Sequence, residues 1–150
     1  MVFLINCQTG AISEYRNYPF NSICRIKDRW FGASPTGIYV LSGETDNGTD
    51  IEAWVKTGDM DLKAPTKKRV TDVYVVVEMV GKGTLRVVCE EHPANVYDVL
   101  APMGGAHNKR VVTARGISGQ HWSFEFRNVA GAFFELYGME ILFDVLSRRV

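Results

Sequence analysis

Cysteine is scarce in this 150-residue sequence, and the patterns that would give it a structural role are missing. The three cysteines, Cys7, Cys24 and Cys89, are odd in number and widely spaced, with no Cys-x-x-Cys pair. This spacing argues against a disulfide framework and against a zinc site. We expect all three thiols to be buried and to act as small hydrophobic side chains.

Net charge and long hydrophobic runs are also missing. Seventeen Lys and Arg residues balance 17 Asp and Glu residues, which argues against nucleic-acid binding. No stretch approaches the roughly 20 apolar residues of a membrane helix, so we predict no membrane insertion. The apolar start, residues 1–5, is too short for a secretion signal, and we expect synthesis in a cytoplasm. The 46% of hydrophobic residues is ample for a core.

Candidate catalytic residues are few. The three histidines, His92, His107 and His121, lie in no recognised nucleophile motif. The Gly81-Lys82-Gly83 segment leads into a predicted strand, so it lacks the helix N-terminus of a phosphate-binding loop. We therefore predict that the protein is not an enzyme and that it holds neither a cofactor nor a metal.

Residues 1–43 are predicted to form about four short strands joined by tight turns, a β-meander that resembles a single propeller blade. A blade has two exposed faces, and propellers cover them by packing several blades together. Only one copy is present, because no repeat occurs at a spacing of about 40–50 residues. The meander must therefore pack on the rest of this chain or on another protein, and the pattern leaves both alternatives open.

Residues 44–50 form a polar joint between this meander and the remainder of the chain. The segment lacks the terminal glutamate of a calcium loop, whereas its Asn47-Gly48 pair is a strong hairpin signal, so we predict a plain turn.

Residues 51–150 are predicted to form an antiparallel β-sandwich, so the fold class is all-β. Residues 120–128 alternate, with Trp122, Phe124 and Phe126 on one face. Residues 133–146 alternate less cleanly, and Gly138 within them predicts a bulge or a close approach of backbone rather than a helix.

Trp54 is the best candidate for an exposed contact residue. It lies on the polar side of the predicted strand 51–56, beside Glu52 and Lys56. An exposed tryptophan can stack on a sugar ring, but aromatic residues are also the usual anchors of protein interfaces. We favour a protein as the partner.

Three short strings carry a basic pair at a predicted strand end: residues 67–70, 108–111 and 147–150. They could form a common basic surface for an acidic neighbour. Charged residues at strand ends also discourage unwanted sheet pairing, and we favour this second interpretation.

Much of the sequence resembles a module in virion proteins of tailed bacteriophages. The strings that carry the resemblance are Trp30–Ser34, Gly37–Gly43, Thr45–Gly48, Thr57-Gly58, Lys68-Arg69-Val70 with Tyr74, Gly119–Glu125, Asn128–Leu136 and Leu146–Val150.

This resemblance implies a structural component of the phage particle, most naturally a tail-tip or baseplate protein located in the virion tail. It implies other tail proteins as partners and a homo-oligomer with three- or six-fold symmetry, because phage tails are built on such rings. The function would then be assembly with neighbouring tail proteins. The alternative is a carbohydrate-binding module that contacts the host surface.

Overall fold

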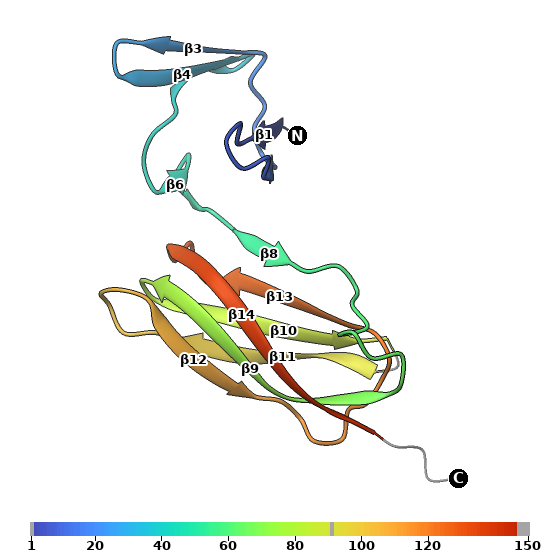
Figure 1. Ribbon diagram of the computed structural model, residues 1–150. Coiled ribbons are helices and arrows are strands. Elements are labelled where there is room, and N and C mark those ends of the chain that lie inside the picture. The colour runs from blue at the N-terminus through green and yellow to red at the C-terminus, as the bar shows by residue number, and fades with distance from the viewer. Residues whose placement is uncertain (1, 91, 147–150) are drawn as a thin grey trace. The chain divides into compact units, whose positions relative to one another are not determined.

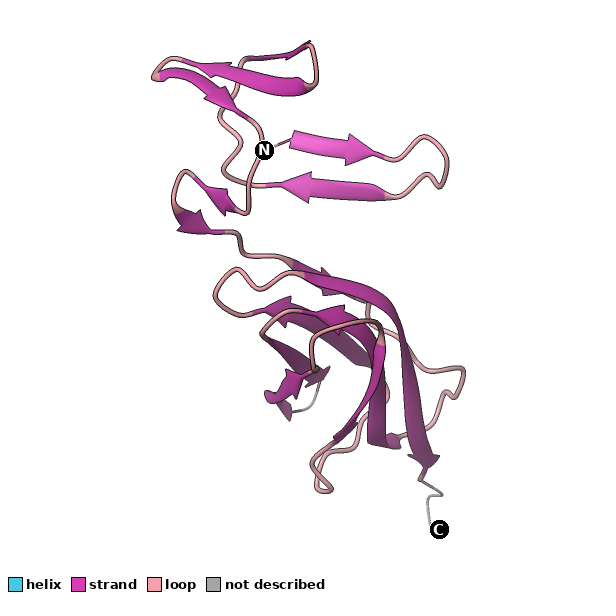
Figure 2. Cartoon of the chain, turned by 90° about the vertical axis from the view of Figure 1, so that its left-hand side faces the viewer, coloured by secondary structure: helices cyan, strands magenta, loops and turns pink. Residues whose placement is uncertain are grey.

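The computed structural model describes residues 2–90 and 92–146, and every regular element in these ranges is a β-strand (Figures 1 and 2). All strand pairs are antiparallel, which confirms the predicted all-β class. The chain divides into two compact units, Met1–Gly43 and Glu44–Val150, here called the first and second units.

The first unit contains five strands in two separate sheets: β1 (Val2–Ile5), β2 (Ile12–Tyr15), β3 (Ser22–Ile26), β4 (Arg29–Ser34) and β5 (Gly37–Val40). Strands β1 and β2 form a hairpin, whereas β3, β4 and β5 form a three-stranded sheet. The prediction of one four-strand meander is therefore wrong. The segment between β2 and β3 contains Asn17 in a left-handed conformation and Pro19, which has no N–H to donate, so the chain leaves the first ladder before β3 begins.

Aromatic side chains gather around Gly32 in the first unit. The ring of Phe20 lies directly over Gly32, where an added Cβ would fall 2.6 Å from the ring. Tyr18 contacts this ring edge-on at a centroid distance of 4.7 Å, and the Tyr39 ring is tilted against it at a centroid distance of 5.8 Å. Gly32 is nevertheless the one residue of the first unit that is buried among those described, so the unit has no hydrophobic core.

The second unit starts with the predicted turn. Strands β6 (Thr45–Asp46) and β7 (Thr49–Asp50) pair directly, leaving Asn47 and Gly48 as a two-residue loop. Both loop residues have positive φ, 49° and 84°, as a type I′ hairpin turn requires. The plain turn is therefore confirmed.

The remainder of the second unit consists of two sheets. One has the strand order β11-β10-β13-β8 and the other β12-β9-β14. Their bounds are β8 (Trp54–Lys56), β9 (Lys68–Met79), β10 (Lys82–Cys89), β11 (His92–Leu100), β12 (His107–Val112), β13 (Trp122–Asn128) and β14 (Phe134–Val145).

Both sheets contribute to one hydrophobic core. The three-stranded sheet supplies a row of valines on β9, and the four-stranded sheet supplies the aromatic face of β13. The fully buried members from these two strands are Val70, Val73, Val75, Val77, Met79, Trp122, Phe124 and Phe126. The alternation predicted for residues 120–128 is confirmed on its apolar side. Within residues 2–90 and 92–146, every buried hydrophobic side chain of the core belongs to the second unit.

Two expected features differ in the structure. Of the predicted strand 51–56, only Trp54–Lys56 joins the sheet. Before Trp54, the Asn128 side chain binds the backbone groups that strand pairing would otherwise use. Its Oδ1 accepts from the Ala53 amide at 2.8 Å, and its Nδ2 donates to the Ile51 carbonyl at 2.8 Å. Of the three thiols, only that of Cys89 is buried, whereas Cys7 and Cys24 are exposed because the first unit has no interior.

Strand β14 contains the bulge predicted near Gly138. Its register against β9 shifts between Leu136 and Gly138, leaving Tyr137 as the extra residue. A second shift, between Leu142 and Phe143, leaves Thr71 as the extra residue on β9. An added Cβ at Gly138 would meet nothing within 4 Å, so the bulge is confirmed and the close backbone approach is not.

Candidate functional site

Trp54 lies on the outer face of the four-stranded sheet, with 43% of its surface exposed. Its register partner on β13 is Arg127, and Lys56 stands opposite Glu125 on the same face. The exposed position expected for this indole is therefore observed.

A row of charged side chains covers this outer face. Glu125 is only 7% exposed because it lies between Arg86 and Arg127, whose Nη atoms are 3.6 Å and 3.2 Å from its carboxylate. Lys82 pairs with Asp98 at 2.8 Å. The acceptors of Glu125 are thus engaged by its own sheet, and Trp54 is the exposed aromatic side chain beside them.

The histidine contacts are local. His121 Nδ1 lies 3.0 Å from Glu90 Oε2, and His107 Nε2 lies 3.2 Å from the Gly104 carbonyl. Neither ring has a hydrogen bond to a serine or cysteine among residues 2–90 and 92–146. Over the same ranges, no group of three or more His, Cys, Asp or Glu side chains could hold a metal ion.

A cavity of about 320 Å³ opens on the outer face of the three-stranded sheet, next to the bulge at Thr71. Arg69, Arg110 and Arg115 line it, and we call these three residues the arginine cleft. They come from the start of β9, from β12 and from the loop after β12. The antiparallel pairing of β9 with β12 therefore brings Arg69 close to Arg110 and Arg115, which are near each other in sequence.

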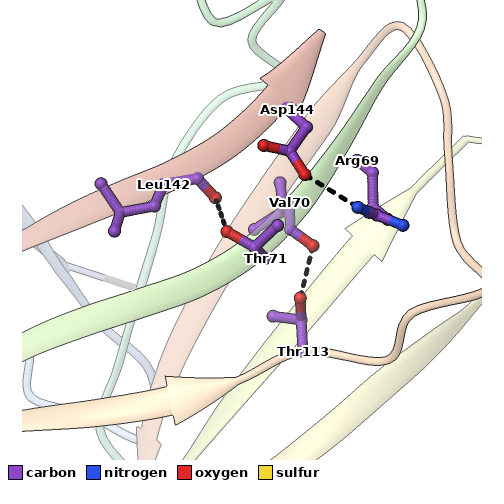
Figure 3. Close-up of polar contacts among 6 residues, drawn as sticks. All are labelled: Arg69, Val70, Thr71, Thr113, Leu142 and Asp144. Carbon is purple, nitrogen blue, oxygen red and sulfur yellow. Dashed lines mark hydrogen bonds and ion pairs between the residues drawn. The ribbon is translucent and has the colours of Figure 1, made fainter. Parts of the chain in front are cut away.

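Two carboxylates hold two of these arginines in place. Arg69 Nη2 lies 2.8 Å from Asp144 Oδ2 on β14 (Figure 3). Arg110 Nε donates to Asp72 Oδ1 at 2.7 Å. This hydrogen bond from Arg110 is the main cause that holds the pKa of the Asp72 carboxyl below its usual value. Both carboxylates therefore have a structural role, because each holds one arginine of the cleft.

The threonine hydroxyls around the arginine cleft are already engaged. Thr113 Oγ1 donates to the Val70 carbonyl at 2.5 Å, and Thr71 Oγ1 donates to the Leu142 carbonyl at 3.2 Å (Figure 3). These bonds tie the strand ends together around the bulge. The guanidinium groups remain as the donors that a ligand could use.

The three basic strings have different positions. Arg69 from the first string and Arg110 from the second line the same cleft. Lys68, however, is fully buried, and its Nζ donates to the Gln120 carbonyl at 2.6 Å. Residues 147–150 lie outside the described part of the chain. The first string is therefore not a uniform basic surface, because one of its basic side chains is buried.

The first unit presents many exposed apolar side chains for its length. Ten of its large apolar residues are between 45% and 77% exposed: Phe3, Leu4, Ile5, Ile12, Tyr15, Ile23, Ile26, Trp30, Ile38 and Val40. The β1–β2 hairpin has apolar groups on both of its faces, because Phe3 and Ile5 alternate with Val2 and Leu4. The predictions for this unit did not identify which of its residues are exposed.

The chain matches no protein-family model, no curated protein and no solved structure. No helix among the described residues has the length and apolar character of a membrane span.

Proposed function

We propose that the protein is a non-enzymatic structural component of a tailed-phage particle, a tail-tip or baseplate protein that acts by assembling with neighbouring tail proteins. In this proposal the second unit is an antiparallel β-sandwich that serves as a rigid body. The first unit is the part that a neighbour covers. The resemblance of the sequence to tailed-phage virion proteins supplies the biological setting.

The observation that supports this proposal is the absence of a buried hydrophobic side chain in the described part of the first unit. Domains of about 40 residues bury too little surface to be stable alone, and they need disulfides, metals or association. Cys7 and Cys24 are free thiols, and the described residues offer no metal cluster. Association is the third of these routes, and we propose that a neighbouring polypeptide covers these strands.

A protein surface fits the first unit better than nucleic acid or a charged membrane surface. Residues 1–43 contain four Lys or Arg residues and two Asp or Glu residues, spread among exposed apolar side chains. Exposed apolar patches with few charges are typical of protein interfaces. A stable contact of this kind buries more than about 1,000 Å² in total. Copies arranged with three- or six-fold symmetry would each present the same patch.

The test is to locate the protein in purified phage particles. The proposal predicts that antibody labelling places it at the distal tail and that peptide mass spectrometry detects it in washed particles. Its absence from intact particles, with abundant protein in the infected-cell lysate, would refute a virion role.

A carbohydrate-binding module is the second candidate, supported by the exposed indole of Trp54 on the outer face of the four-stranded sheet. This function predicts saturable quenching of tryptophan fluorescence by cell-envelope glycans. Trp54→Ala would abolish the response, whereas the matched Lys56→Ala variant on the same strand would retain it. Identical titrations for all three proteins would rule out a sugar site at Trp54.

A further inference from the structure

We propose that the arginine cleft is a binding site for an acidic side chain of a polypeptide, with a single carboxylate as the group it recognises. The cleft lies in the second unit, so this inference goes beyond the apolar assembly surface of the first unit. The inference does not require the acidic partner to be a tail protein.

The cleft has donors that the chain itself does not use. Arg69 Nε is buried and has no hydrogen-bond partner within the described residues. This nitrogen lies below the surface, so a ligand in the cleft would meet the outer part of the guanidinium group, and the Arg69 side chain is 37% exposed. The Arg115 side chain is exposed, and no hydrogen bond or ion pair joins it to any residue of ranges 2–90 and 92–146.

The charge of the site fits one carboxylate better than a phosphate. Three guanidinium groups face two carboxylates, those of Asp72 and Asp144, so a net charge of +1 remains. A singly charged carboxylate neutralises this excess. A phosphate dianion would leave a net negative site and would be repelled by the Asp72 carboxylate on the same wall.

The walls of the cavity favour a side chain over a small polar metabolite. The Thr71 and Thr113 hydroxyls already donate to backbone carbonyls, so they offer no further proton to a ligand. Val112, which is more than half exposed, provides an apolar wall against which the methylene groups of a glutamate can pack. Guanidinium groups bind carboxylates through paired hydrogen bonds, which gives geometric selectivity for that group.

The test is isothermal titration calorimetry on the full chain with a blocked tetrapeptide that has one central glutamate. The control ligands are the same peptide with glutamine in place of the glutamate, and inorganic phosphate. The wild-type protein should bind the glutamate peptide saturably and the glutamine peptide not at all. Arg115→Ala should weaken this binding about tenfold, the effect of one charge-assisted contact. Arg115→Lys keeps the charge but loses the planar guanidinium group, so its affinity for the glutamate peptide should lie between those of the wild type and Arg115→Ala.

The matched control is Arg25→Ala, which changes net charge equally but removes an exposed arginine of the first unit. It should bind the glutamate peptide as the wild type does. Equal affinities for Arg115→Ala and Arg25→Ala, binding of phosphate in preference to the peptide, or no binding would each overturn the inference. Far-UV circular dichroism shows whether each variant is folded. None of these results depends on whether the protein occurs in a phage tail.

Discussion

Replacing Phe126 with alanine should be the most damaging truncation in the second unit. Its side chain is fully buried and packs edge-on against Phe134, with the ring centroids 5.1 Å apart. Removing a buried phenylalanine costs about 3–5 kcal/mol, and lost aromatic pairing contributes about 0.5–1.5 kcal/mol of this total. We expect a loss of about 4 kcal/mol in the free energy of unfolding.

Urea unfolding followed by tryptophan fluorescence measures this loss, because Trp122 lies in the same buried core. The control is Ile38→Ala on β5, a side chain that is 77% exposed. This control should change the unfolding free energy by less than about 0.5 kcal/mol. A loss below about 1 kcal/mol for Phe126→Ala, or equal losses for both variants, would refute the assignment of the core to the second unit.

Three further predictions concern packing, pH and thiol accessibility. Gly83→Ala should destabilise the protein by about 1–3 kcal/mol in urea unfolding, whereas Gly138→Ala should have little effect. An added Cβ would lie 2.6 Å from Phe126 Cζ at Gly83 but would meet nothing at Gly138, so equal effects would contradict the packing described. Asp72→Asn should destabilise the protein near neutral pH, and its difference from the wild type should close as the pH falls below about 4. Arg110 lowers the pKa of Asp72 in the folded state, so the ionised carboxylate stabilises the fold at pH values above the unfolded pKa. This stabilisation is lost as the pH falls and the carboxyl becomes protonated. A stability difference between variant and wild type that persists in acid would contradict this. A thiol reagent should modify Cys7 and Cys24 in the native protein and Cys89 only after unfolding, and rapid native labelling of all three would contradict its burial.

Local patterns predicted the elements whose interactions are local. The positive φ values of Asn47 and Gly48 follow from the turn chemistry of that residue pair. The aromatic face of β13 follows from strict alternation. The single four-strand meander was wrong because the hydrophobic pattern of residues 1–43 defines strands but not which of them pair.

Features that depend on distant residues could not be predicted from the sequence pattern. Asn128 contacts the backbone of Ile51 and Ala53, which are more than 70 positions away. Lys68 looked like a surface charge, but it is buried because Gln120, also distant in sequence, accepts its hydrogen bond. The arginine cleft likewise exists because β9 pairs with both β12 and β14.

The burial of polar residues on the outer face of β13 also depends on neighbouring strands. Ser123 and Glu125 are polar and alternate with the aromatic residues of this strand, yet both are buried. Glu125 is covered by arginines from its own and the adjacent strand, and this register is set by pairing with β10. Polarity alone therefore did not predict exposure at these positions.

The central claim is that another polypeptide covers the apolar strands of the first unit. Sedimentation velocity of the purified full chain over a wide concentration range tests this claim most directly, with the paired substitutions Phe3→Ser and Ile5→Ser as the perturbation. We predict that the wild type associates, either with itself or with added tail proteins. The double variant should lose this association while its second unit stays folded. The account would be contradicted by three results together. The wild type would be a monomer at every concentration, it would not respond to tail proteins, and the amides of β1 and β2 would be protected from hydrogen exchange.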